Sequence, residues 1–372
     1  MHVAVIGAGL MGASVAYHLA RAGVDVTVID PQQPGQATSG ASFACVNAST
    51  PEINDRRYFE LCARAVEEHD VLAGSLGGGW LHRTGHLRWA DPASPQDGGA
   101  LLEHARQLRE RGYQAEEWDP AEVTARLEPG LVIPRQVSRV VYFPREAWID
   151  APALAAQLVA VVPHRIAEYV TGISLSGDRV RALRLSSGAE LRVDAVVNAA
   201  GPWSGHVASL AGRELPLAPS SGLVARLATP TVPVRRAMHA GPVEIRPDGT
   251  GRVLLHSRRI DARLDTTRHT GDRLIRDLIG LAVAVVPPLA AAELADARVG
   301  CRPMPADTYP SVGAVAATGA YYELVGHHGA TLAPLLGRLL ATEIRTGELD
   351  DRLAPYRPGR PSLTATATGP AS

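Results

Sequence analysis

Apolar and polar positions along the first thirty residues predict a strand, a helix and a second strand. Residues 2–6 form a short apolar run, which is the pattern of a buried parallel strand. A glycine-rich turn, 7–12, separates this run from a helix that Gly23 is placed to end. A second apolar strand follows over 24–29. The chain therefore opens as a βαβ unit.

The rest of the chain alternates between further helical and strand-like segments. Apolar residues recur at helical spacing in two long stretches, 56–76 and 331–345. Residues 357–372 have few core-forming side chains and are expected to form a flexible tail. Shorter helices are predicted at 99–111, 120–127, 152–162 and 272–291, and strands at 86–93, 173–175, 180–185, 195–199, within 215–260 and at 321–325.

Composition narrows the classes of function. The net charge is −1, so no basic surface for nucleic acid is indicated. No apolar stretch reaches the roughly 20 residues of a transmembrane helix, and we expect no signal peptide. The chain has three cysteines, Cys45, Cys62 and Cys301. Because their number is odd and they are widely spaced, neither a disulfide framework nor a metal site is indicated. A cytoplasmic protein is therefore expected. The chain contains no lysine, which excludes every lysine-based mechanism.

Gly7, Gly9 and Gly12 form a Gly-x-Gly-x-x-Gly motif in the context that dinucleotide binding requires. The motif follows an apolar strand, opens a helix and precedes Asp30, which ends the next strand eighteen residues after Gly12. Gly7 allows the tight turn, Gly9 lets backbone amides approach a pyrophosphate, and Gly12 permits close packing of helix on strand. The helix N-terminus attracts the phosphates, and Asp30 can accept hydrogen bonds from ribose hydroxyls. The alternative is a tight turn that binds no ligand.

The glycine motif does not distinguish NAD from FAD. Two features favour FAD. Residues 38–42 follow the second strand directly where a simple crossover helix would otherwise stand, and the chain returns to the nucleotide late, through 195–203 and 326–345. An NAD-linked dehydrogenase with the same N-terminal fold and a non-catalytic flavin-binding subunit of a larger complex are the alternatives.

Several motifs taken together resemble the D-amino-acid oxidase-like FAD enzymes, in particular the glycine oxidase and sarcosine oxidase branch. The resemblance extends over almost the whole chain. The motifs are the N-terminal glycines with Asp30, the loop of Ser39 and Ser42, 168–170, 198–204, 300–303 with Asp307, Pro310 and Gly313, and 326–334.

The resemblance implies an α/β fold with two domains. One is a Rossmann-like FAD-binding domain of the glutathione-reductase type, and the other is an α+β substrate domain that carries an antiparallel sheet. The FAD-binding domain is expected to be discontinuous and the substrate domain to be inserted in it. The expected boundaries are 1–85, 140–214 and 295–356 for FAD binding, and 86–139 and 215–294 for substrate binding.

The resemblance also implies which residues contact FAD. Val170 should hold the adenine edge through its backbone, and 326–332 should reach the pyrimidine edge of the flavin. A helix that starts at Thr331 would stabilise negative charge on the reduced ring, although an ordinary glycine-rich helix start is the alternative. The implied FAD residues are Gly7, Gly9, Leu10, Met11, Gly12, Asp30, Pro31, Ala37, Thr38, Ser39, Ser42, Phe43, Ala44, Val170, Ala200, Gly201, Trp203, Gly300, His328, Gly329, Ala330, Thr331 and Leu332.

On the substrate side the resemblance singles out Arg302, within a Gly-x-Arg-Pro motif that binds the substrate carboxylate in glycine oxidase-like members. A planar guanidinium can form two parallel charge-assisted hydrogen bonds to a carboxylate, and a surface ion pair is the alternative. The family's reaction passes a hydride from the amine carbon to the flavin, which oxygen or another acceptor re-oxidises. Side chains need only remove the ammonium proton, for which His256, His327 and His328 are candidates. The alternative for each histidine is a hydrogen bond to the backbone. The predicted catalytic residues are Arg302, His328 and His256.

Three positions depart from the family pattern. The sarcosine oxidase branch uses a lysine to activate oxygen, and this chain has none. Glu244 lies near the position of a tyrosine in glycine oxidase, where it would change what the pocket accepts. Cys301 lies in the region of covalent flavin attachment in sarcosine oxidase relatives, but its surroundings follow glycine oxidase, so non-covalent FAD is expected. The expected partner is a small-molecule amine or amino acid, and the oligomeric state stays open.

Overall fold

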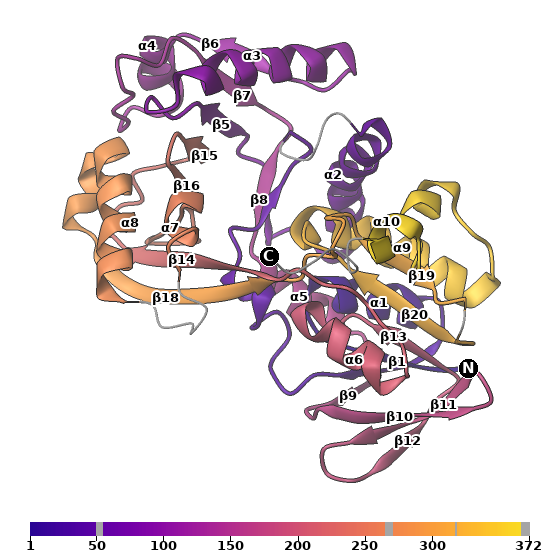
Figure 1. Ribbon diagram of the computed structural model, residues 1–372. Coiled ribbons are helices and arrows are strands. Elements are labelled where there is room, and N and C mark those ends of the chain that lie inside the picture. The colour runs from indigo at the N-terminus through magenta and orange to yellow at the C-terminus, as the bar shows by residue number, and fades with distance from the viewer. Residues whose placement is uncertain (50–54, 265–270, 317, 366–372) are drawn as a thin grey trace.

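The computed structural model describes residues 1–49, 55–264, 271–316 and 318–365 (Figure 1). A six-stranded sheet forms the centre of the first domain, in the order β19-β20-β13-β1-β2-β9. Its strands are parallel except β19, which pairs antiparallel with β20. Their bounds are β1 (His2–Ile6), β2 (Asp25–Ile29), β9 (His164–Ile166), β13 (Ala195–Asn198), β19 (Ser311–Ala314) and β20 (Tyr321–Val325).

The alternating side chains of β1 bury both faces of this sheet. Val3 and Val5 pack into a core formed with helices, whereas Ala4 and Ile6 pack into a second core on the other face. The helices are α1 (Leu10–Arg21), α2 (Arg56–Leu76), α5 (Ala151–Val159) and α9 (Gly329–Thr346). The other face carries the sheet β10 (Val170–Ser176), β11 (Arg179–Leu185) and β12 (Glu190–Arg192), with α6 (Ser204–Leu210). The predicted βαβ opening, β1-α1-β2, is confirmed.

The second domain is built on a mixed eight-stranded sheet, in the order β18-β14-β17-β16-β15-β5-β7-β6. Every neighbouring pair is antiparallel except β15 and β5. The strands are β5 (His86–Trp89), β6 (Glu116–Trp118), β7 (Val140–Phe143), β14 (Ser220–Ala228), β15 (Ala237–Ala240), β16 (Val243–Pro247), β17 (Arg252–His256) and β18 (Glu293–Arg302). Helix α8 (Asp272–Val285) packs on this sheet, and α3 (Pro95–Glu110) lies beyond β7 (Figure 1). The expected two-domain α/β architecture is confirmed.

Short elements connect the two domains. The sheet β3-β8-β4 consists of β3 (Cys45–Val46), β8 (Ala147–Ile149) and β4 (Leu81–His82), and β8 runs between the two larger sheets in Figure 1.

The remaining helices are single turns or little more: η1 (Thr38–Ala41), α4 (Pro120–Glu122), η2 (Val123–Leu127), η3 (Gly201–Trp203), α7 (Arg258–Asp261), η4 (Pro287–Ala291), η5 (Asp351–Tyr356) and α10 (Pro361–Ala365). Among the described residues no helix has both the length and the apolar character needed to cross a bilayer.

The structure changes the expected boundaries at three places. Strand β7 pairs with β5 and β6, and β18 pairs with β14 along its length, so 140–143 and 295–302 belong to the eight-stranded sheet. Their apolar pattern does not reveal which sheet they join. The first part of the expected tail is also ordered, because Arg360 forms an ion pair with Asp307 and Leu363 is buried. Residues 366–372 lie outside the described part of the chain.

Candidate functional site

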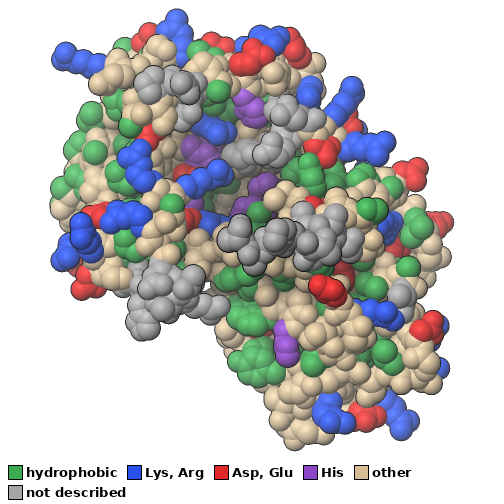
Figure 2. Space-filling model, in the orientation of Figure 1, with side chains coloured by type: hydrophobic (Ala, Val, Ile, Leu, Met, Phe, Trp, Pro, Cys, Tyr) green, Lys and Arg blue, Asp and Glu red, His purple; other side chains and the backbone are tan. Residues whose placement is uncertain are grey.

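One large cavity, of about 1280 Å³, is lined by both domains. Its wall runs from the glycine loop before α1, past η1 and the turn before α9, to the side chains of β16, β17 and the end of β18. Figure 2 shows histidine and arginine side chains gathered in the recess at the centre of the face displayed. The cavity therefore joins the predicted nucleotide site to the predicted substrate residues.

The glycine loop has the geometry that its sequence predicts. Gly7 has a φ of +107°, and a Cβ there would lie 2.3 Å from the Ala199 carbonyl oxygen. A Cβ on Gly12 would lie 2.0 Å from the Gly7 carbonyl oxygen, so Gly12 is needed for packing and not for contact with the cavity. A Cβ on Gly9 would meet only the Ser39 hydroxyl, at 3.3 Å. Gly9 is thus the glycine whose missing side chain leaves room in the cavity.

Asp30 lies at the end of β2, as predicted, and lines the cavity. Its Oδ2 accepts a hydrogen bond from the Ala8 amide at 2.7 Å, and its Oδ1 accepts one from the Gln32 amide at 2.8 Å. The carboxylate therefore holds the glycine loop as well as facing the cavity, where a ribose hydroxyl can reach it.

Most of the other implied FAD residues also line the cavity. Leu332 does not, because it is fully buried in the core between the helices. Neither does Gly12, for the packing reason given above. The implied residues that line the cavity are Gly7, Gly9, Leu10, Met11, Asp30, Pro31, Ala37, Thr38, Ser39, Ser42, Phe43, Ala44, Val170, Ala200, Gly201, Trp203, Gly300, His328, Gly329, Ala330 and Thr331.

Two helix N-termini face this cavity, and both suit a flavin dinucleotide. Gly9 caps α1 and His328 caps α9, and neither residue bonds its helix through a side chain. The positive end of α1 matches a pyrophosphate, and that of α9 matches the electron-rich edge of a flavin. Thr331 Oγ1 donates to the Cys45 carbonyl oxygen at 3.2 Å, which holds β3 beside the start of α9. The residues present therefore fit FAD.

Arg302 is already bonded to the protein at both terminal nitrogens. Its Nη2 donates to Asp261 Oδ2 at 2.5 Å, and its Nη1 donates to the Ser221 carbonyl oxygen at 2.9 Å. Asp261 also lies 2.8 Å from His256 Nε2, and His256 Nδ1 lies 2.7 Å from Glu244 Oε2. These side chains form one continuous series of contacts along the cavity wall. A substrate carboxylate would have to share Arg302 with Asp261, which was not expected from the sequence.

The charges in this series follow from burial and from the neighbours. Burial lowers the pKa of His256, but Glu244 and Asp261 outweigh it and raise the pKa to about 9. Burial raises the pKa of Glu244, but His239 and His256 hold it well below its usual range. The imidazole of His256 is therefore protonated at neutral pH. This conflicts with the predicted role of His256 as a proton acceptor and makes it a fixed positive charge.

His327 and His328, on the turn before α9, have the opposite charge state. Burial lowers the pKa of His328 to about 4 and that of His327 to about 3. Both line the cavity, and both rings are neutral at neutral pH. His328 Nδ1 lies 2.7 Å from the Tyr58 hydroxyl, which fixes the ring. His328 is thus the better placed of the predicted catalytic histidines to accept a proton.

Arg258 lines the same end of the cavity and was missed by the sequence analysis. It begins the short helix α7, and its side chain makes no hydrogen bond or ion pair with any residue that the structure describes. Its charge contributes to the low pKa values of His327 and His328, so it lies close to them. Asp261 and Tyr58 were missed as well. No local motif marks any of the three, because each becomes part of the site only through tertiary packing.

Cys301 lies apart from the cavity. Its neighbours Gly300 and Arg302 line the cavity, whereas Cys301 does not, as expected for the middle residue of three in a strand. Its carbonyl oxygen accepts a hydrogen bond from Thr38 Oγ1 at 3.0 Å.

Comparison with known proteins identifies the family. The model of the DAO family, FAD dependent oxidoreductases, matches residues 2–343. The chain belongs to this family. This FAD-dependent oxidoreductase is 30% identical to a glycine oxidase of Pseudomonas aeruginosa, over 96% of this chain and 98% of that one. It is 28% identical to the uncharacterized oxidoreductase YurR of Bacillus subtilis, over 95% and 97% of the two chains.

Solved structures of related enzymes share the fold. Glycine oxidase from Geobacillus kaustophilus superimposes with a TM-score of 0.84 at 22% identity, over 95% of this chain and 97% of that one. Iminodiacetate oxidase from a Chelativorans species superimposes with a TM-score of 0.82 at 25% identity, over 96% and 98%. The family assignment decides between the alternatives: the cofactor is FAD and not NAD, and the protein is an enzyme.

Proposed function

We propose that this oxidoreductase converts the C–N bond of a small amino acid, or of an N-substituted amino acid, to an imine. FAD supplies the oxidising power by accepting a hydride from the carbon beside the nitrogen. The observation that supports an amino acid over a plain amine is the charge balance at the far end of the cavity. Carboxylates and cations meet there, and the cations are in excess.

The cavity-lining charges at this end come from five side chains. Glu244 and Asp261 are carboxylates, Arg258 and Arg302 are guanidiniums, and His256 is an imidazolium. Two negative charges against three positive charges leave one positive charge, which suits a ligand that carries one carboxylate. Arg258 has no partner among the described residues, so it can bind a carboxylate without giving up an existing bond.

The substrate nitrogen needs an acceptor for its proton before oxidation. A neutral His328 with its proton on Nδ1 donates that proton to the Tyr58 oxygen, and its Nε2 is then an acceptor. Tyr58 holds the ring in this orientation. His256, already protonated and held between two carboxylates, instead orients Glu244 and Asp261.

Anaerobic bleaching of the flavin absorbance near 450 nm tests the proposal. Matched pairs of substrate with and without a carboxylate are compared: glycine with methylamine, sarcosine with dimethylamine, and iminodiacetate as a dicarboxylate. We expect the carboxylate member of a pair to reduce the flavin at lower concentration. Equal reduction by both members of every pair, or no reduction by any, would contradict the proposal. Oxygen readmitted afterwards shows whether oxygen is the electron acceptor.

A further inference from the structure

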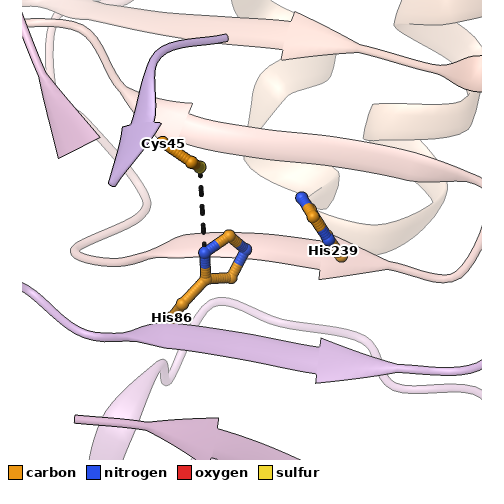
Figure 3. A group of neighbouring side chains, drawn as sticks. All are labelled: Cys45, His86 and His239. Atoms are coloured by element: carbon orange, nitrogen blue, oxygen red, sulfur yellow. Dashed lines mark hydrogen bonds between the residues drawn. The ribbon is translucent and has the colours of Figure 1, made fainter. Parts of the chain in front are cut away.

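Three donor side chains meet beside the cavity where the two domains join. They are Cys45 of β3, His86 of β5 and His239 of β15, and one donor atom of each lies within 4.8 Å of the other two. Figure 3 shows the Cys45 sulfur and the two imidazole rings around one space. His86 pairs with Ala237 across the parallel strands β5 and β15, so His86 and His239 project from the same face of the sheet.

Hydrogen bonding accounts for only part of this cluster. Cys45 Sγ lies 3.8 Å from His86 Nδ1, and Glu146 Oε2 lies 3.5 Å from the same nitrogen. His239 Nε2 lies 3.5 Å from Glu244 Oε1. The sulfur contact is a weak hydrogen bond, whereas the two 3.5 Å separations are long for hydrogen bonds between nitrogen and oxygen. Two buried atoms here, His86 Nε2 and Glu146 Oε2, have no hydrogen-bond partner within the described part of the chain. Buried polar atoms without a partner are rare, and an ion is one of the usual reasons for them.

We propose that Cys45, His86 and His239 bind a zinc-type divalent metal ion. Zinc bonds of about 2.0 Å to imidazole nitrogen and about 2.3 Å to thiolate place the ligand atoms of a tetrahedral site roughly 3.3–3.5 Å apart. The three donor atoms are within 4.8 Å already, so small side-chain rotations close the site. Binding releases the Cys45 thiol proton to solvent, and the thiolate forms the bond to the metal.

Two carboxyl groups, those of Glu146 and Glu244, lie beside the three donors, and so do the guanidiniums of Arg88 and Arg246. The Glu146 side chain is completely buried, and its Oε1 accepts bonds from the Ser49 amide at 3.1 Å and from the Tyr113 hydroxyl at 3.0 Å. These bonds direct Oε2 toward His86. Glu146 Oε2 and Cys45 Sγ approach the same His86 Nδ1, so Glu146 lies on the side of the ring that faces the cysteine and adds a carboxyl group beside the cluster. Glu244 Oε1 adds a second, 3.5 Å from His239 Nε2. The sequence indicated no metal site, so this set of three donors differs from that prediction.

One coordination position faces the cavity. Cys45 and His239 line the cavity wall, whereas His86 lies behind it. Three protein ligands leave a fourth position for water or for a group of a bound ligand. The ion also joins the FAD-binding side of the molecule, through β3, to the eight-stranded sheet. This metal site does not depend on the proposed function, since it can bind an ion whatever substrate is oxidised.

Zinc content of the purified holoenzyme tests the site. The FAD-loaded protein is equilibrated with Zn²⁺ alone, desalted and assayed for zinc and FAD, and its zinc X-ray absorption is recorded. We expect about one zinc per FAD, bound to one sulfur and to nitrogen or oxygen neighbours. Cys45→Ser and His86→Ala each remove one of the three ligands, so each should lower the affinity for zinc by more than the roughly 10- to 100-fold that loss of an outer-shell partner costs. Cys301→Ser, which changes a cysteine away from the cavity, is the matched control and should bind zinc as the unmodified chain does.

Circular dichroism and the flavin absorbance show that each variant is folded. If one variant fails to fold, the other variant and the sulfur signal of the unmodified protein still decide the outcome. Folded holoenzyme that retains less than about a tenth of an equivalent of zinc would overturn the proposal. So would a zinc spectrum without a sulfur neighbour, or a Cys45→Ser protein that binds zinc unchanged.

Discussion

The two arginines at the substrate end, Arg302 and Arg258, differ in the bonds that they already make within the protein. Arg302 pairs with Asp261, so its removal would take one of two cationic partners from a largely buried carboxylate, leaving His256, as well as remove a substrate contact. Arg258 has no partner among the described residues, so its removal breaks no existing bond; it changes the charge facing the substrate and removes the smaller of the two causes that lower the pKa of His328, burial being the larger. Arg258 is therefore the cleaner probe of carboxylate binding.

Arg258→Ala should keep FAD and raise the KM for amino acid substrates by roughly 10- to 100-fold, as expected for loss of a charge-assisted hydrogen bond. The KM for amines without a carboxylate should change far less. Steady-state kinetics with the matched pairs measures this difference. Arg259→Ala is the control, because Arg259 pairs with Asp91 outside the cavity. A similar increase in KM for both members of a pair would show that Arg258 does not bind the substrate carboxylate.

His256 makes carboxylate binding depend on pH. Its pKa of about 9 means that the imidazolium charge is present at neutral pH and is lost as the pH rises through 9. The groups in contact with it are Glu244, Asp261 and Arg302, of which both carboxylates stay ionised over this range. Deprotonation removes the positive excess, so affinity for an anion falls.

We expect the Kd of benzoate, a carboxylate that this chemistry cannot oxidise, to rise above pH 9 in the unmodified enzyme. Perturbation of the flavin spectrum reports the binding. His256→Gln should bind more weakly at pH 7 and should lack the step near pH 9. A step of the same size in the variant would assign the titration to another group.

At the scale of elements, the turn between β1 and α1 shows what local sequence can predict. The strand, the turn, the helix and Asp30 lie within thirty residues, and Gly7 and Gly12 each have a steric reason that is visible in the backbone. Such a unit follows from local periodicity and turn chemistry. Asp261 and Arg302 lie 41 residues apart and meet only because β14 pairs with β18. No local pattern predicts that contact, nor the meeting of Cys45, His86 and His239.

Gly9→Val should abolish FAD retention and leave the fold intact. A Cβ at this position meets only the Ser39 hydroxyl, so the protein tolerates it, but a valine side chain occupies the space where a pyrophosphate approaches the backbone. The measurement is FAD content after purification, with circular dichroism as the check on folding. Gly74→Val, in an exposed part of α2 with no atom near its Cβ position, should remain yellow. A yellow Gly9→Val protein would contradict the phosphate role of the turn.

At the scale of the whole molecule, the eight-stranded sheet holds a loop that lines the cavity on its FAD side. Arg226 of β14 donates through Nη2 to the Gly40 carbonyl oxygen at 2.8 Å, and Arg246 of β16 donates through Nε to the Phe43 carbonyl oxygen at 2.7 Å. Both arginines also pair with Asp248. Buried arginines of the second domain thus fix the η1 loop of the first.

Arg226→Met should weaken FAD binding by roughly 5- to 150-fold without unfolding the protein. The variant removes the bond to Gly40, yet the two carboxylates that Arg226 contacts keep other partners, since Asp248 pairs with Arg246 and Asp296 with Arg298. The loss is therefore that of one loop anchor, worth about 1–3 kcal/mol for a hydrogen bond from a charged donor. Arg252→Met is the matched control, because Arg252 also contacts Asp248 but is exposed and has no bond to the loop. Titration of the stripped proteins with FAD gives both dissociation constants. Equal affinity in the two variants would mean that the second domain does not hold the FAD loop, and that the cavity wall is set by the first domain alone.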